Sequence, residues 1–115
     1  MVKYSGRQLD SVFSALSDGT RRAILERLSE RDWAVSELAD PFEMSLPAVW
    51  KHLRILEDAG LVRCQKDGRV KRCKLDASPM KGAAKWIDHY RVFWEGRLDA
   101  LAEYLETEMK REKPK

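Results

Sequence analysis

The sequence predicts a small, mainly α-helical protein that carries one β-hairpin. Three observations lead to this fold class. The chain has 115 residues, which is the size of one domain. Apolar residues recur at helical spacing along most of its length. After Gly60 this period changes, and two β-prone runs flank the pair Asp67-Gly68, a strong signal for a tight hairpin.

The composition excludes several classes of protein. Hydrophobic residues make up 43% of the chain, enough for a folded core. No apolar run approaches the ~18 residues of a membrane-spanning helix, and residues 1–10 lack the apolar stretch of a secretory signal. We therefore expect a single cytoplasmic domain over residues 1–109, followed by a disordered basic tail at 110–115.

Positive charge is concentrated in one part of the sequence. The net charge of the whole chain is only +3. Residues 47–74, however, carry eight basic and three acidic side chains, whereas residues 1–46 and 75–109 are both net acidic. A localised basic patch suits a polyanion such as DNA, although it is also compatible with an ordinary solvated surface.

Three helices are expected before the basic segment. Apolar residues at helical spacing predict the first helix over residues 7–16. The second spans 19–30, with Ser17 or Asp18 as its N-cap. Ser36 caps a short third helix over about 37–40, which Pro41 ends.

The fourth helix has the clearest boundaries. Ser45 is a good N-cap, and Pro47 sits in the first turn, where a missing N–H group costs nothing. Val49, Leu53 and Leu56 then form a buried stripe, and Gly60 provides the stop after residue 59.

The hairpin brings the two cysteines onto neighbouring strands. With Asp67-Gly68 as a two-residue turn, Cys64 lies opposite Lys71, and Val62 lies opposite Cys73. The cysteines are then diagonal to each other, which is poor geometry for a disulfide. Two cysteines are also too few for a disulfide scaffold. A redox role for either cysteine remains open at this point.

A long helix is expected over residues 79–108, and its apolar stripe is too broad for one small core. Two interpretations stay open: the stripe packs inside the domain, or it forms a dimer face together with the first helix. The residues of this candidate dimer face are Leu9, Val12, Phe13, Leu16, Trp86, Tyr90, Phe93, Trp94, Leu98, Leu101 and Leu105.

The order of these elements predicts a DNA-binding motif. A short helix, a turn and a second helix over about 36–59 make a helix-turn-helix, and the basic hairpin over about 61–75 then forms a wing. The second helix of such a motif enters the major groove. Its candidate DNA-binding residues are Ser45, Pro47, Ala48, Trp50, Lys51, His52 and Arg54. For Trp50 and His52, packing against the scaffold is the alternative interpretation.

Several ordered runs closely resemble the ArsR-type winged helix-turn-helix regulators. The matching runs are residues 15–25 (ALSDGTRRAIL), 35–39 (VSELA), 44–56 (MSLPAVWKHLRIL) and 59–62 (AGLV). Residues 90–98 (YRVFWEGRL) resemble the branch encoded beside START-like (SRPBCC) genes. The large Trp50 and Gly19 depart from the family pattern, in which a small hydroxyl residue and a proline are usual.

The resemblance implies how such a protein would contact DNA. It implies that the wing lies along phosphates or in the minor groove, through Arg63, Lys66, Arg69, Lys71 and Arg72. Thr20 and Arg21 open the second helix, where an N-terminus suits a phosphate, although a capped helix with a surface arginine fits equally well. A homodimer of this type binds a pseudo-palindromic operator and represses its own operon.

The family's usual metal sites are missing from the sequence. Residues 37–42 contain no cysteine, and Asp88 and His89 are adjacent on a helix, so their side chains diverge. We therefore expect no metal and no cofactor, and no arrangement of residues resembles an enzyme's catalytic site. The identity of any small-molecule effector stays open. The alternative function is a winged-helix module that binds proteins and does not recognise a DNA sequence.

Overall fold

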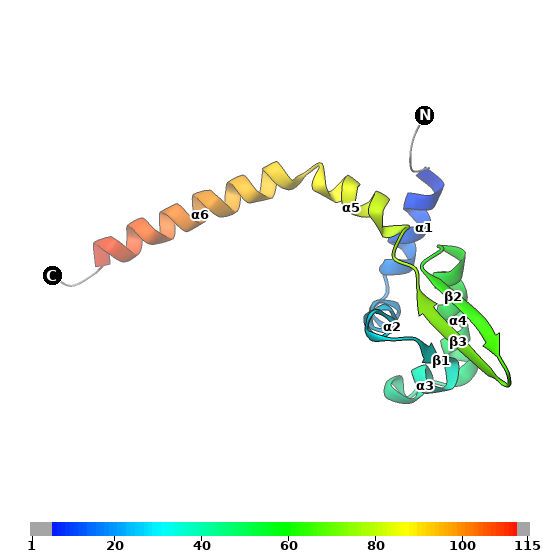
Figure 1. The fold of residues 1–115 in the computed structure, drawn as a ribbon. Coiled ribbons are helices and arrows are strands. Elements are labelled where there is room, and N and C mark those ends of the chain that lie inside the picture. The colour runs from blue at the N-terminus through cyan, green and yellow to red at the C-terminus, as the bar shows by residue number, and fades with distance from the viewer. Residues whose placement is uncertain (1–5, 113–115) are drawn as a thin grey trace. The chain divides into compact units, whose positions relative to one another are not determined.

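The computed structural model describes residues 6–112 and contains six α-helices and three strands within that range (Figure 1). The elements are α1 (Gly6–Leu16), α2 (Gly19–Glu30), β1 (Trp33–Ala34), α3 (Val35–Ala39), the 3-10 turn η1 (Asp40–Phe42), α4 (Leu46–Asp58), β2 (Val62–Asp67), β3 (Val70–Leu75), α5 (Met80–Asp88) and α6 (Arg91–Glu112). The chain divides into two compact units, Met1–Ala83 and Ala84–Lys115, and each is described by itself. The predicted fold class, mainly helical with a small hairpin, is confirmed.

The core of the first unit lies between helices α2, α3 and α4 and one face of the sheet. The stripe predicted for α4 is fully buried, with Val49, Leu53 and Leu56 each 0% exposed. Ile24 of α2 and Leu38 of α3 are equally buried and belong to the same cluster. The sequence pattern therefore identified the face on which α4 is anchored.

Local capping sets the limits of α2 and α4. The carboxylate of Asp18 accepts a hydrogen bond of 3.0 Å from the N–H of Arg21, which makes Asp18 the N-cap of α2. The hydroxyl of Ser45 accepts one of 3.3 Å from the N–H of Ala48 at the start of α4. After α4, Gly60 has a φ of 79°, the left-handed conformation that glycine adopts most easily.

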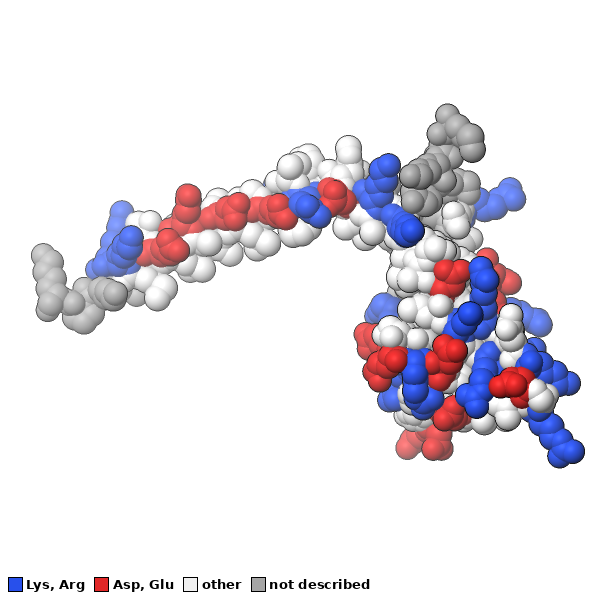
Figure 2. Space-filling view, viewed as in Figure 1, with Lys and Arg blue, Asp and Glu red and all other residues white. Residues whose placement is uncertain are grey.

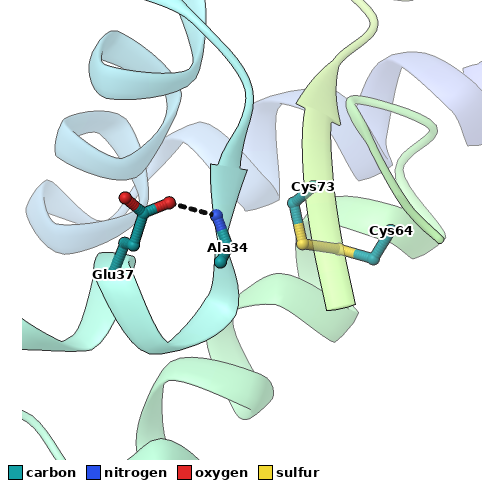
Figure 3. Close-up of a disulfide and its surroundings, with 4 residues drawn as sticks. All are labelled: Ala34, Glu37, Cys64 and Cys73. Carbon is teal, nitrogen blue, oxygen red and sulfur yellow. Dashed lines mark hydrogen bonds between the residues drawn. A yellow bond between two sulfur atoms is a disulfide. The ribbon is translucent and has the colours of Figure 1, made fainter. Parts of the chain in front are cut away.

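The entrance to α3 differs from the prediction. The helix starts at Val35, and the N–H of Ala34 donates a 2.8 Å hydrogen bond to the Glu37 carboxylate (Figure 3). Trp33 and Ala34, expected as a simple break between helices, form strand β1. Two residues are too few to show a strand period, and their pairing with β3 depends on contacts far along the chain.

The hairpin register also differs, and the predicted diagonal placement of the cysteines is wrong. Asp67 pairs with Val70, so the two turn residues are Gly68 and Arg69. Gly68 has a φ of 66°, as expected for glycine at the first position of a type II′ turn. Cys64 therefore lies directly opposite Cys73, and the two form a disulfide (Figure 3).

The long helix predicted over 79–108 is interrupted at His89 and Tyr90. The N–H of Tyr90 donates to the carbonyl of Ile87 at 3.0 Å, and that of Phe93 donates to the carbonyl of Tyr90 at 3.1 Å. These bonds span three residues, so the α-helical ladder is replaced by a tighter turn here. The segment α6 continues to Glu112, so residues 110–112 of the predicted tail are helical. Residues 113–115 lie outside the described part of the chain.

Within residues 6–112, no helix combines the length and the hydropathy that crossing a bilayer requires.

Candidate nucleic-acid interface

Helix α4 presents a mixed polar and apolar face opposite its buried stripe. The structure leaves Pro47, Lys51 and Arg54 exposed, and Ala48 is half-buried. Ser45 is exposed as well, although its hydroxyl is already used as the N-cap. Pro47, Lys51 and Arg54 also line a surface cavity of about 540 Å³. The periodicity of the sequence therefore separated the outward from the inward residues of this helix correctly.

Trp50 is half-buried and packs against the core cluster. Its indole ring also meets the hairpin, because the ammonium nitrogen of Lys71 lies 5.2 Å from the ring centroid. This is a cation–π distance. Trp50 thus contacts the scaffold and the hairpin, and this contact joins the two basic elements predicted to bind DNA.

His52 and Arg21, predicted to contact DNA, take part in a contact between helices. The Nε of Arg21 donates to the carbonyl of Ala15 at 2.8 Å, and its Nη2 donates to the carbonyl of Ser14 at 3.1 Å. Its Nη1 lies 3.4 Å from His52 Nδ1. Both side chains are half-buried, as is Thr20. Arg21 therefore ties the end of α1 to α4, an arrangement that no sequence spacing revealed.

Asp18 lies beside this network. Its carboxylate is 3.9 Å from His52 Nδ1. The hydrogen bond from the N–H of Arg21 lowers the pKa of Asp18 below its ordinary value, and the positive charge of Arg21 adds to the effect. The capping carboxylate is therefore held in its charged form at the start of α2.

We use the name wing for residues 61–75, which comprise β2, the turn and β3. Strand alternation puts Cys64 and Lys66 of β2 on the same face of the sheet as Lys71 and Cys73 of β3. This is the face that packs on the core through Cys73. Arg63 and Arg72 lie on the opposite face. Arg63 pairs with Asp76 at 3.2 Å, and Arg72 pairs with Asp67 at 3.4 Å. All five predicted wing residues are exposed.

The far end of the wing contains only two strands, because β1 pairs with β3 no further than Arg72 and Cys73. We call residues 66–71 the wing tip. It carries Lys66, Arg69 and Lys71, and none of the three forms an ion pair among the described residues. Figure 2 shows blue side chains gathered around this part of the hairpin. The exposed Lys74 belongs to the same basic strand but was not among the residues predicted to bind DNA.

The candidate dimer residues fall into both units. In the first unit Leu9, Phe13 and Leu16 are partly exposed, whereas Val12 is fully buried. Val12 packs in the interior of its own unit, and its place in a dimer interface stays a prediction. The exposed members in the second unit are Trp86, Tyr90, Phe93, Trp94, Leu98, Leu101 and Leu105, each between 43% and 64% accessible.

The candidate metal-site residues do not converge. Asp88 forms an ion pair with Arg91, and His89 packs edge-on against Tyr90 with ring centroids 5.0 Å apart. Among the residues that the structure describes, no group of three or more His, Cys, Asp or Glu side chains is arranged to hold a metal ion.

Comparison with known proteins agrees with this architecture. A helix-turn-helix domain family matches residues 16–65, from the end of α1 into β2. The Mycobacterium tuberculosis HTH-type transcriptional regulator Rv2034 is 37% identical over 102 residues, covering 89% of this chain and 92% of that protein. The crystal structure of an ArsR family transcriptional regulator, RHA00566, is 44% identical and superposes with a TM-score of 0.73 over 83% of this chain and 97% of that one. The chain belongs to the ArsR family of helix-turn-helix transcriptional regulators.

Another relative of the chain is named as a repressor. The Bacillus subtilis transcriptional repressor SdpR is 30% identical over 79 residues, which cover 69% of this chain and 88% of SdpR. The expected winged helix-turn-helix architecture is confirmed by these relatives and by the fold. These relatives are named as regulators of transcription and not as enzymes.

Proposed function

We propose that this ArsR-family regulator is a homodimeric repressor of its own operon, acting in the cytoplasm and without catalytic activity. In this proposal α4 enters the major groove of an operator, and the wing lies on the backbone or in the adjacent minor groove. Two copies would place two α4 helices about one DNA turn apart, which requires a pseudo-palindromic site.

One observation carries the DNA-binding surface of this proposal: Lys71 of the wing stands against Trp50 of α4. The contact brings the exposed Lys51 and Arg54 of α4 and the basic wing tip to one side of the first unit. Binding to double-stranded DNA needs a helix in the groove and basic side chains on the flanking phosphates at the same time. This contact supports the assignment of α4 and the wing tip to one DNA-binding surface.

The residues of α4 receive separate roles in this proposal. Lys51 is exposed and donates to guanine O6 and N7 or to a phosphate. Pro47 and Ala48 are small enough to contact a thymine methyl group in the groove. Arg54 lies one turn further along the helix and binds the backbone. Trp50 and His52 act mainly through the scaffold contacts described above.

The wing residues also divide into two groups. Arg63 and Arg72 already neutralise Asp76 and Asp67, whereas Lys66, Arg69 and Lys71 have no carboxylate partner among the described residues. We assign the main phosphate contacts to the second group. Each such contact contributes about −0.9 to the slope of log affinity against log salt concentration.

The second copy of the chain would cover the apolar face of α6. Trp94, Leu98, Leu101 and Leu105 recur every three or four residues and so share one side of this helix, yet all are about half exposed. A contiguous apolar face of this kind marks an interaction site. The double variant Leu98→Glu with Leu101→Glu is expected to sediment as a monomer. A dimer of unchanged stability would remove α6 from the interface.

Fluorescence anisotropy tests the DNA-binding proposal. The duplex upstream of the protein's own gene is compared with a shuffled duplex of the same composition at two salt concentrations. We expect tighter and salt-sensitive binding to the native duplex, and we expect Lys51→Ala to lose that preference. The matched control is Lys81→Ala, because Lys81 is an exposed basic residue of α5 that lies outside the proposed DNA-binding surface. Equal weak binding to both duplexes would contradict autoregulation and favour the protein-interaction alternative.

A further inference from the structure

We propose that Cys64 and Cys73 form a reversible thiol–disulfide modification site that controls the order of the wing tip. The reagent class is a low-molecular-weight disulfide, such as glutathione disulfide. The inference rests on the proposed DNA-binding role of the wing, and it concerns the regulation of that surface.

The position of the pair in the sheet is the first argument. The strand order is β1-β3-β2, so Cys73 lies on the central strand and Cys64 on an edge strand. The two residues are direct partners in the register, and their Cα atoms are 4.0 Å apart. A sulfur–sulfur bond can therefore open and close without any change in the register of the hairpin.

The two sulfurs differ in accessibility, which sets the order of the reaction. Cys73 is 0% exposed, pairs with Trp33 of β1 and belongs to the core cluster. Cys64 is only partly buried. In the reduced protein the thiolate of Cys64 attacks the low-molecular-weight disulfide, which gives a mixed disulfide and releases one thiolate. The thiolate of Cys73 then attacks the Cys64 sulfur and releases the second. The net reaction converts two protein thiols and one disulfide into one protein disulfide and two small thiols.

The surroundings of Cys64 favour this chemistry. Lys66 of β2 and Lys71 of β3 lie on the same face of the hairpin as Cys64, and neither forms an ion pair among the described residues. Positive charge stabilises the thiolate, which is the reactive form. It also attracts glutathione disulfide, whose carboxylates are negatively charged.

The bridge sits at the point where the sheet changes from three strands to two. Strand β1 supports β3 only at Arg72 and Cys73. Beyond them the wing tip is a two-stranded hairpin, an element that is marginally stable on its own in water. With the bridge closed, Lys66 and Lys71 are held in register two residue pairs further on. With the bridge open, the tip frays and must be ordered again when it binds DNA.

In the proposed cytoplasmic location, the Cys64–Cys73 disulfide would form reversibly and would not be a permanent structural bond. Disulfides in that compartment are mostly transient and serve sensing or catalysis. We expect the reduced tip to bind phosphates less tightly by about three- to tenfold, the cost of ordering one or two flexible side chains. Oxidation would therefore strengthen repression.

Two measurements on the full chain test the proposal. Glutathione disulfide is added to the reduced protein, and mass spectrometry is expected to show the loss of two hydrogens, reversed by dithiothreitol. Limited trypsin digestion is expected to cut after Lys66, Arg69 and Lys71 faster in the reduced protein than in the oxidised one. Thiols that stay unmodified, or that stop at a mixed disulfide, would overturn the modification site. Equal cleavage would overturn the control of wing-tip order.

DNA affinity is measured separately by anisotropy on the reduced and oxidised protein. Cys64→Ser is expected to bind like the reduced wild type and to ignore glutathione disulfide, with Cys64→Val as a second variant if the serine variant does not fold. Affinity that is the same in both states would overturn the link to DNA. If neither state binds any duplex, the proposed function fails, while the mass and proteolysis results still decide the modification site.

Discussion

Helix α4 and the wing tip carry the same kind of charge but are supported in different ways. Val49, Leu53 and Leu56 fix α4 in the core, and Ser45 and Gly60 fix its ends. Residues 66–71 are the two-stranded end of the sheet, where Lys71 contacts Trp50 of α4. A rigid helix suits the recognition of base edges, where small displacements matter. A loosely held tip suits phosphates, which can be bound from many angles, and it is also easier to regulate.

The largest expected difference between the two regions is in folding stability. Leu53→Ala removes a fully buried side chain and should lower the free energy of unfolding by about 2–5 kcal/mol. Val70→Ala in the wing tip alters a side chain that is 40% exposed and should cost less than about 0.5 kcal/mol. Urea denaturation followed by circular dichroism measures both variants. Similar losses would show that the wing tip is part of the cooperative core.

The second difference is between sequence preference and salt dependence. Lys51→Ala should reduce the discrimination between operator and shuffled DNA by about 1–3 kcal/mol, because a base contact is lost. Arg69→Ala should weaken binding to both duplexes and make the salt slope shallower by about 0.9. Anisotropy titrations at several salt concentrations separate the two effects. The reverse pattern, with specificity carried by Arg69, would exchange the roles given to the helix and the tip.

A smaller effect is expected where the two regions meet. Lys71→Met keeps an apolar stem against Trp50 but removes the charge, and should cost about 0.5–1 kcal/mol of stability. Lys66 is the direct cross-strand neighbour of Lys71, so Lys66→Met is the matched control for the loss of one charge. Thermal unfolding of both variants gives the comparison. An equal change in both would mean that the Trp50 contact contributes nothing.

The smallest effect concerns the support of the wing by β1, and it depends on pH. The Ala34 N–H that donates to Glu37 lowers the pKa of this carboxyl below its ordinary 4.5, and nearby Arg31 and Arg72 act in the same direction. A lowered pKa means that the stabilisation is present above about pH 4.5 and is lost as the pH falls through the folded-state value. The difference in unfolding free energy between wild type and Glu37→Gln should therefore shrink on acidification. A constant difference would exclude the charged hydrogen bond as its cause.

The parts of the fold that were predicted correctly are those fixed by neighbouring residues in the sequence, such as caps, apolar spacing and turn glycines. Helix α4 was predicted to within one residue, because a cap, a repeated apolar spacing and a terminal glycine agree there. The hairpin was also predicted, but its register was not. The pair Asp67-Gly68 indicates a turn, but it does not decide whether glycine occupies the first or the second loop position. This choice shifts the register by two residues and changes the cross-strand partner of Cys64 from Lys71 to Cys73.

Contacts between distant residues account for the remaining differences. Strand β1 exists because Trp33 finds Cys73 on another strand, and a run of two residues carries no pattern. The break at His89 and Tyr90 has neither proline nor glycine to announce it. In the candidate site, the outward face of α4 followed from periodicity, whereas the contact of Arg21 with His52 joins residues 31 positions apart. Such pairs depend on how helices pack, which spacing along the chain does not determine.

The side chain of Arg21 also provides a mechanical link. One guanidinium holds the last carbonyls of α1 and touches His52 in the middle of α4. Any twist of the end of α1 must either break these bonds or be passed to α4. An event at the N-terminal helix, such as the arrival or departure of a second molecule, would therefore reach α4 through this side chain as well as through the direct packing of α1 on α4.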